Sequence, residues 1–316
     1  MSSGDDGPTV LVVGAGRVGT YCACKLARAG VAGEVILKGS DRSRGVSSMQ
    51  PFVDAMCGEA GVRFIRDYES LRDRVVDFVF VTVKTYDLPA VKADMDALGV
   101  RPRVAIMVHN GIVAPLFDVS VRVVIPQSYD FVETPGLGCG VDIHVKNEEK
   151  PWVMPDTPEA KEVEALLERA GVRAAADPQF AYSLLRKFFI NCVANLLAIV
   201  GDCNCNGLLA NHRPRMETLY DEMMDVLAEA HADGFAALPE DFRDVVFSGL
   251  ATYGEHFPST KLDFDAGRAL EIDSLNGYVC QVARRDGSAS PANERLVEEV
   301  RTLVARRDAD AGLQSK

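Results

Sequence analysis

An amine and two amides recur at intervals of four residues in one apolar stretch of the chain. Lys187, Asn191 and Asn195 lie within the segment 186–200, and residues four apart share one face of an α-helix. Most of the other residues in this segment are apolar, so the spacing predicts a largely buried helix with one polar stripe. An unpaired buried polar group costs about 1–3 kcal/mol, and a lone ammonium costs far more. The stripe is therefore a candidate ligand-binding site, with a solvated helix face as the alternative.

A glycine-rich loop at residues 14–19 is a second place where chemistry could occur. It follows a β-branched run, Thr9–Val13, that predicts a fully buried strand, and a helical pattern begins after it at Tyr21. A further strand is predicted over Glu34–Lys38, so the loop joins the first strand to the helix of a β-α-β unit. In this context the GxGxxG spacing favours a dinucleotide-binding loop over an ordinary glycine-rich turn.

Each glycine of the loop has a distinct expected role. Gly14 would allow the tight turn, Gly16 would let the backbone approach a pyrophosphate, and Gly19 would permit close packing of helix on strand. The phosphates would then meet the N-terminus of the helix. The predicted cofactor-binding residues of the loop are Gly14, Ala15, Gly16, Arg17, Val18 and Gly19.

The end of the second strand bears on which dinucleotide binds. NAD-binding proteins usually carry an Asp or Glu there to accept from the ribose hydroxyls, whereas this chain has Lys38, Ser40 and Arg42. Cations favour a 2′-phosphate, so these three residues predict contacts to NADPH. Asp41, which lies among them, keeps NADH open as the alternative.

The alternation of strands and helices continues and places two more polar residues. Lys84 follows a predicted strand at 78–83, and Asn110 follows one at 104–108. Ligands of open α/β sheets bind beyond the carboxyl ends of the strands, so Lys84 and Asn110 are predicted to lie at the same edge as Gly14. The other elements expected in this half are a helix at 47–60, a strand at 62–65, small antiparallel additions to the sheet at 121–153 and a closing helix at 157–170.

The strand-like runs stop near residue 176, where we predict a domain boundary. Residues 1–176 would form a Rossmann-type α/β domain that binds the dinucleotide, and residues 177–316 would form an all-helical domain. Within the second domain the pattern predicts a loop at 201–207, a helix at 216–232 with its methionines in the core, a turn at 257–260, a helix opened by Glu271 and a frayed tail at 307–316.

Composition and charge exclude several classes of protein. Of the 316 residues, 47% are hydrophobic and 25% are charged, as in an ordinary globular protein. The formal net charge of −12 argues against a general binder of nucleic acid or of anionic membranes. No secretory segment and no apolar run approaching about 18 residues is evident, so we expect a cytoplasmic protein. The eight cysteines lack the spacing of a structural zinc site, and we expect reduced thiols and no metal.

Together, these residues resemble the ketopantoate reductase (2-dehydropantoate 2-reductase) family, along nearly the whole chain. A GxGxxG loop alone would be common to many dinucleotide-binding proteins, whereas the full set of motifs is hard to obtain by chance. The resemblance is carried by the loop at 14–19 with Tyr21, by Lys84 and its neighbours, by Asn110-Gly111-Ile112, and by a C-terminal pair of blocks: Lys187, Asn191 and Asn195, then Ser259, Asp263 and the run from Glu271 to Gly277.

This resemblance implies NADPH-dependent reduction of a 2-oxo acid, ketopantoate to pantoate, in the synthesis of pantothenate and coenzyme A. It implies a helical domain of the 6-phosphogluconate-dehydrogenase-like type and a cleft between the two domains. Lys187 would be the general acid, a role worth about 10²–10⁴-fold in rate, and Glu271 would keep its amine in place. The implied substrate contacts are Asn110, Asn191, Asn195 and Ser259; Lys84 and Asn110 would also meet the cofactor. A homodimer is left open.

Four positions depart from the family pattern. The chain has His109 in place of the usual Gln, Leu185 in place of Trp and Thr260 in place of Met, and all three would line the substrate region. Ser40 stands where the family usually has an Arg after the second strand. The alternatives are therefore another 2-oxo acid reductase, an opine-type dehydrogenase that reduces an imine, and a non-catalytic NADPH-binding sensor.

Overall fold

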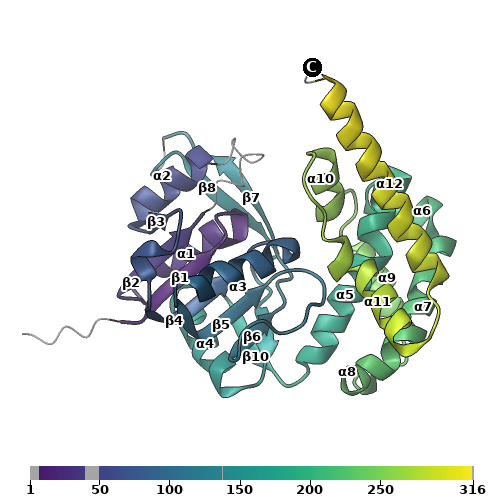
Figure 1. The fold of residues 1–316 in the computed structure, drawn as a ribbon, viewed down its shortest axis with the longest axis horizontal. Helices are drawn as coiled ribbons and strands as arrows, with labels where there is room; N and C mark the ends of the chain where they lie inside the picture. Colours follow the sequence, from purple (N-terminus) through teal and green to yellow (C-terminus); the bar gives the residue numbers. More distant parts are fainter. Residues whose placement is uncertain (1–6, 40–49, 137, 315–316) are drawn as a thin grey trace, which may run out of the picture. The chain divides into compact units, whose positions relative to one another are not determined.

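The chain forms two compact units. The computed structural model describes residues 7–39, 50–136 and 138–314. Unit 1 comprises Met1–His109 and Ala114–Phe180, and unit 2 comprises Asn110–Val113 and Ala181–Lys316. Unit 1 is an α/β structure, and the described part of unit 2 consists of helices and their connections (Figure 1). This confirms the predicted fold class of a Rossmann-type region followed by a helical one.

Unit 1 is organised around a six-stranded parallel sheet with strand order β3-β2-β1-β4-β5-β6. The order reverses between β1 and β4, and open α/β sheets bind ligands outside the carboxyl ends of the strands at such a point. The strands are β1 (Thr9–Val13), β2 (Glu34–Lys38), β3 (Arg63–Ile65), β4 (Val75–Val81), β5 (Arg101–Val108) and β6 (Ser120–Val123), and the helices are α1 (Arg17–Arg28), α2 (Gln50–Ala60), α3 (Leu88–Ala97) and α4 (Pro158–Arg169).

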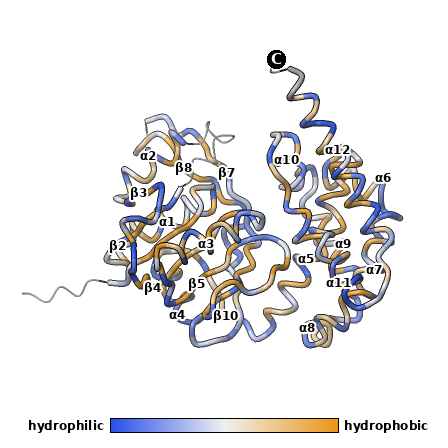
Figure 2. Tube along the Cα trace, viewed as in Figure 1, coloured by the Kyte–Doolittle hydropathy of each residue, from blue (hydrophilic) through white to orange (hydrophobic). Residues whose placement is uncertain are grey.

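Strands β1, β4 and β5 of this sheet are mostly buried because both of their faces are apolar. The central strand β1 keeps Val10, Leu11, Val12 and Val13 at 1% exposure or less. Figure 2 shows the same hydrophobic character along the strands of unit 1. A continuous apolar run, in place of an alternating one, is typical of a parallel strand covered on both sides, as the sequence predicted.

In the region 121–153, the predicted antiparallel additions to the sheet are present in part: beyond the edge strand β6, Val124 and Val153 form an antiparallel bridge. Strand β6 pairs parallel with β5 and completes the main sheet. Strands β7 (Ser128–Glu133) and β8 (Val141–Lys146) form a separate antiparallel pair, while β9 (Trp152–Pro155) pairs parallel with β10 (Ala174–Asp177). The physical reason lies in the connections: helix α4 is the crossover between β9 and β10, and a crossover returns the chain in the same direction.

Unit 2 is built around α5 (Phe180–Gly201), whose apolar side chains form the centre of its core. By length and composition α5 could also cross a membrane, but 67% of its most apolar window is buried inside the structure, as in a core helix. The other helices are α6 (Cys205–Asn211), α7 (Arg213–Ala230), α8 (Ala232–Ala236), α9 (Phe242–Ala251), α10 (Ser259–Asp265), α11 (Asn276–Asp286) and α12 (Pro291–Gln314), with one 3₁₀ turn, η4 (Ile272–Ser274).

Two segments predicted as irregular include the first turns of helices. The predicted loop at 201–207 ends early, because the Asn204 side-chain oxygen accepts a hydrogen bond from the Gly207 amide at 2.9 Å and caps α6. The predicted turn at 257–260 ends at Pro258, and Ser259 and Thr260 open α10. Asn and Pro are common both in loops and at helix starts, so composition alone does not separate the two.

The C-terminal helices also begin and end at other residues than the sequence predicted. Glu271 precedes the 3₁₀ turn η4, and Leu275, with φ −110° and ψ −119°, separates this turn from α11, so the predicted single helix is broken. The tail predicted to fray from residue 307 continues as α12 to Gln314. Arg307 explains part of this order, because its guanidinium donates to the Phe264 carbonyl oxygen at 2.9 Å.

Candidate active site

The loop between β1 and α1 in unit 1 has the geometry of a phosphate cradle. Gly14 has a φ of 115°, which L side chains rarely adopt, and a Cβ on Gly19 would lie 1.9 Å from the Gly14 carbonyl oxygen. A Cβ on Gly16, in contrast, would meet no atom within 4 Å. Helix α1 begins at Arg17 and has no acidic residue within its own first turn, where the helix dipole favours an anion. The loop therefore fits a dinucleotide pyrophosphate.

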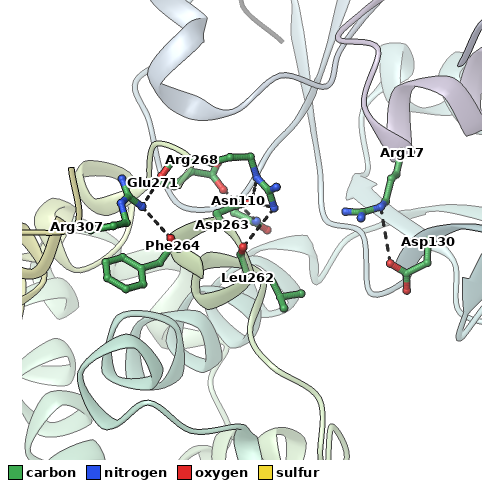
Figure 3. A network of polar contacts seen from close by, with 9 residues as sticks. All are labelled: Arg17, Asn110, Asp130, Leu262, Asp263, Phe264, Arg268, Glu271 and Arg307. Carbon is green, nitrogen blue, oxygen red and sulfur yellow. Dashed lines mark hydrogen bonds and ion pairs between the residues drawn. The ribbon is translucent and has the colours of Figure 1, made fainter. Parts of the chain in front are cut away.

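The neighbours of this loop include one residue that the sequence did not single out. The Thr82 hydroxyl lies 3.0 Å from the Gly14 carbonyl oxygen and 3.1 Å from that of Val13, so it ties the end of β4 to the loop. Ala15 and Val18 pack against the core of unit 1. The Arg17 guanidinium lies 3.7 Å from the Asp130 carboxylate (Figure 3). The sequence predicted Thr82 to lie inside the strand at 78–83, whereas β4 ends at Val81 and leaves Thr82 just beyond it.

The polar residues predicted at the neighbouring strand ends are placed only in part. Lys38 ends β2, and its ammonium lies 4.8 Å from the centroid of the Tyr68 ring. Ser40 and Arg42 lie outside the described residues. Lys84 follows β4 and precedes a 3₁₀ turn, with its side chain half-buried. Unit 1 thus offers a cation at the end of β2 and another after β4.

The segment Asn110–Val113 follows β5 in the sequence but belongs to unit 2. The Asn110 amide donates to the Glu271 carboxylate at 3.4 Å, and the Ile112 backbone amide donates to the Ser274 carbonyl oxygen at 2.9 Å. Gly111 is required between them, because its φ is 69° and a Cβ there would lie 2.1 Å from the same carbonyl oxygen. Figure 3 shows Asn110 beside Glu271. The structure therefore joins Asn110 to the C-terminal block of predicted site residues.

The Glu271 side chain is buried, with 3% of its surface exposed. Its backbone is fixed by Ser274, whose hydroxyl donates to the Glu271 carbonyl oxygen at 3.2 Å. A buried carboxylate is stable only with donors around it. Asn110 supplies one such donor.

The polar stripe on α5 has the predicted position within a mostly buried helix. Lys187 and Asn191 are half-buried, and Asn195 is 5% exposed. The Asn195 side-chain nitrogen lies 3.2 Å from the Thr260 hydroxyl, which is itself 1% exposed. Thr260 therefore satisfies the deepest amide of the stripe. Ser259, the predicted substrate contact, is the first residue of the same short helix α10.

Helix α10 is held by ionic contacts that the sequence did not reveal. Lys261 is 5% exposed, and its ammonium lies 2.5 Å from Asp265 and 2.9 Å from Asp202. Burial lowers the pKa of Lys261, but its hydrogen bonds to these carboxylates outweigh burial and raise the pKa above its usual value. Asp263 accepts from Arg268 at 2.8 Å (Figure 3). Only the four-residue spacing of Lys261 and Asp265 was a signal for this network.

The cysteines and acidic groups of the described residues form no metal site. All eight cysteines are free thiols, and burial raises the pKa values of Cys22, Cys192 and Cys280. Within residues 7–39, 50–136 and 138–314, no group of three or more His, Cys, Asp or Glu side chains could hold a metal ion.

Two family models match the chain. The model described as ketopantoate reductase PanE/ApbA matches residues 10–115, and the model of its C-terminal region matches residues 179–304. The 2-dehydropantoate 2-reductase of Shigella flexneri is 35% identical over 118 residues, a match that covers 37% of this chain but only 38% of that protein. The enzyme of the same name from Caulobacter vibrioides is 29% identical over 228 residues, which is 70% of this chain and 76% of that protein.

Solved structures share the fold over almost the whole chain. A PanE/ApbA family ketopantoate reductase from Ralstonia eutropha JMP134 superposes with a TM-score of 0.74 at 23% identity, over 95% of this chain and 99% of that one. D-mandelate dehydrogenase, solved with NADH and anilino(oxo)acetate, superposes with a TM-score of 0.70 at 18% identity, over 94% of this chain and 99% of that one. From the two family models and these matches, the chain belongs to the ketopantoate reductase family.

Proposed function

We propose that this protein reduces 2-dehydropantoate (ketopantoate) to pantoate with NADPH, a step in the synthesis of pantothenate and coenzyme A. The observation that carries the proposal is the buried Glu271 carboxylate paired with Asn110, in the same unit as the Lys187 stripe of α5. These residues lie in the two segments that the family models match. The glycine loop of unit 1 supports a dinucleotide as the second reactant.

Lys187 is the proposed general acid. NADPH, when bound, supplies the hydride that reduces the ketone carbon. Negative charge then develops on the ketone oxygen, and the Lys187 ammonium stabilises this charge and delivers the proton. Positioned proton donors of this kind contribute about 10²–10⁴-fold to the rate. Charge stabilisation at the same oxygen adds to this effect, because the donor is already in place when the charge forms.

The surrounding polar groups orient the substrate in this proposal. Glu271 accepts a hydrogen bond from the substrate hydroxyl and keeps the Lys187 amine in place. Asn110 fixes the rotamer of Glu271 through their contact at 3.4 Å. Asn191, Asn195 and Ser259 bind the carboxylate and hydroxyl groups of the 2-oxo acid, and Thr260 holds Asn195 in place.

NADPH is the proposed cofactor on the basis of charge. Lys38 ends β2, where a carboxylate would favour NADH. The relevant measurement is kcat/KM with NADPH and with NADH at the same substrate concentration. We expect at least tenfold higher kcat/KM for NADPH; equal values would contradict this part of the proposal. Lys84 and Asn110 are the further proposed cofactor contacts.

The central test replaces Lys187. We expect Lys187→Ala to reduce turnover at least about a hundredfold while the dissociation constant of NADPH stays within about threefold of the wild type. Turnover is followed by NADPH absorbance with ketopantoate and with a panel of other 2-oxo acids, with and without amino acids. The control is Lys161→Ala, which removes a lysine paired with Asp156 on unit 1. Near-normal turnover of Lys187→Ala would reject the assignment of the acid.

Two further expectations concern the protein in the cell. We propose a cytoplasmic location, in keeping with a small 2-oxo acid and NADPH as reactants. A homodimer stays a prediction, and light scattering of the purified protein at several concentrations would measure it.

A further inference from the structure

Two cations rest on aromatic rings at neighbouring strand ends of unit 1. The Lys38 ammonium lies 4.8 Å from the centroid of the Tyr68 ring, and the Arg66 guanidinium lies 5.7 Å from that of Phe64. Strands β2 and β3 are parallel, with Lys38 opposite Ile65, so Lys38 and Arg66 leave the sheet at the same carboxyl edge. The rings therefore gather positive charge at the end of β2.

Tyr68 acts in this contact through its ring. The side chain is 2% exposed, and within the described part of the chain its hydroxyl has no hydrogen-bond partner. Burial, together with the charge of Asp94, raises the pKa of this hydroxyl, so the side chain is neutral. A neutral ring attracts a cation through the negative potential of its face. The hydroxyl contributes no bond, and the buried ring has a fixed orientation.

An aromatic ring as partner leaves the Lys38 ammonium able to bind an anion. A carboxylate would occupy the ammonium N–H donors and neutralise the charge, whereas an aromatic face attracts the charge without accepting a conventional hydrogen bond. Among the described residues, no carboxylate forms an ion pair with Lys38. The ammonium is thus held at one place with donors that an oxyanion can use.

We propose that Tyr68 is a positioning residue that sets the preference for a phosphorylated dinucleotide. Its ring holds the Lys38 ammonium at the carboxyl end of β2, where the 2′-phosphate of NADPH binds. The inference rests on the proposed use of NADPH and extends it to a residue outside the glycine loop and the β2 end.

The test compares Tyr68→Leu, which removes the ring, with Tyr68→Phe, which removes only the hydroxyl. Dissociation constants for NADPH and NADH are measured by the fluorescence of the reduced nicotinamide, and those for 2′,5′-ADP and 5′-AMP by calorimetry. We expect Tyr68→Leu to weaken NADPH and 2′,5′-ADP at least about fivefold relative to NADH and 5′-AMP, the size of a lost cation–π contact. Tyr68→Phe is expected to keep the wild-type ratios.

Phe78→Leu is the matched control, because it removes a buried ring that lies 4.9 Å from the Arg103 guanidinium elsewhere in unit 1. This variant loses packing in the same way but is expected to keep the ratio of NADPH to NADH affinity. If Tyr68→Leu does not fold, fluorinated phenylalanines at position 68 keep the ring volume and weaken only the negative face. NADPH affinity should then fall with each added fluorine while NADH affinity stays constant.

The outcomes separate this inference from the proposed function. A wild-type protein that binds NADH as tightly as NADPH overturns the proposed cofactor and the role of Tyr68 with it. A wild-type preference for NADPH that persists in Tyr68→Leu, or in the fluorinated series, overturns the role of Tyr68 alone.

Discussion

The glycine loop of unit 1 and the polar cluster of unit 2 are built in opposite ways. The loop is shaped by the absence of side chains: a Cβ on Gly19 would lie 1.9 Å from a backbone oxygen. The polar cluster is shaped by buried and half-buried side chains that hydrogen-bond to each other, as Asn195 does with Thr260 and Asn110 with Glu271. At its crowded positions the loop tolerates no added atoms, whereas a cluster of side chains tolerates no lost hydrogen-bonding groups.

This difference predicts which substitutions damage the fold and which damage only binding. In unit 1 the critical quantity is volume, so the smallest side chain is already a severe change at some positions. In unit 2 the critical quantity is hydrogen bonding, so a substitution of equal volume is the informative one. Four variants probe the contrast, from the largest expected effect to the smallest.

Gly19→Ala should have the largest effect. The added methyl would overlap the Gly14 carbonyl oxygen and the Thr82 hydroxyl, and overpacking costs about 1–3 kcal/mol or more. We expect a lower free energy of unfolding and no measurable binding of NADPH, checked by urea denaturation and fluorescence titration. Wild-type stability together with wild-type affinity would contradict the inference that this loop has no room for a side chain at Gly19.

Gly16→Ala changes the same loop without crowding it. Its φ of −84° suits any residue, and a Cβ there meets no protein atom within 4 Å. We therefore expect stability within about 0.5 kcal/mol of the wild type. The methyl would occupy the approach of the pyrophosphate, so NADPH affinity should fall at least about tenfold, equal to about 1.4 kcal/mol. Unchanged affinity would show that the phosphates lie elsewhere.

Thr260→Val is the matching change in unit 2, because it keeps the volume and removes the hydroxyl. The buried Asn195 amide loses its partner at 3.2 Å, which costs about 1 kcal/mol of stability. We expect a several-fold higher KM for the 2-oxo acid and an unchanged KM for NADPH, measured by steady-state kinetics. Thr252→Val is the control, since its hydroxyl donates only to a carbonyl oxygen of its own helix; a similar change in KM there would contradict the role of Thr260.

The smallest expected effect is a pH dependence of stability at His231, which lies in unit 2. Burial, together with the charge of Arg285, lowers the pKa of His231, and its Nε2 lies 3.0 Å from the Tyr278 hydroxyl. The unfolded state then binds a proton more readily, so the contribution to stability is present above about pH 6.5 and is lost as the pH falls. After correction for the intrinsic exchange rate at each pH, the protection factors of backbone amides in α8 and α11 should fall modestly between pH 7 and 5.5. His231→Gln should remove this part of the pH dependence.

The sequence predicted what depends on local pattern. The apolar run Thr9–Val13, followed by Gly14 and Gly19, indicated a buried strand and a tight loop because burial and φ constraints are properties of single residues. The periodicity of α5 likewise predicted a buried helix and the face that carries Lys187. These features need no knowledge of distant partners.

The sequence did not predict what depends on partners far along the chain. The contact of Asn195 with Thr260 joins residues 65 positions apart, and that of Asn110 with Glu271 joins residues 161 apart. Pro258 looked like part of a turn, because nothing local shows that Lys261 and Asp263 will be buried and paired in the helix that follows it. The parallel pairing of β9 and β10 was missed for the same reason, since direction is set by the path of the chain.

The membership of Asn110–Val113 in unit 2 has a consequence for protein engineering. The backbone passes between the units three times, at 109–110, at 113–114 and at 180–181. A fragment that begins at Ala181 lacks the amide that Asn110 donates to Glu271 and the one that Ile112 donates to Ser274. A chimaera that takes its helical unit from a relative must therefore also take the relative's counterpart of Asn110–Val113. Otherwise the residue at the position of Glu271 lacks the hydrogen bond that Asn110 donates here.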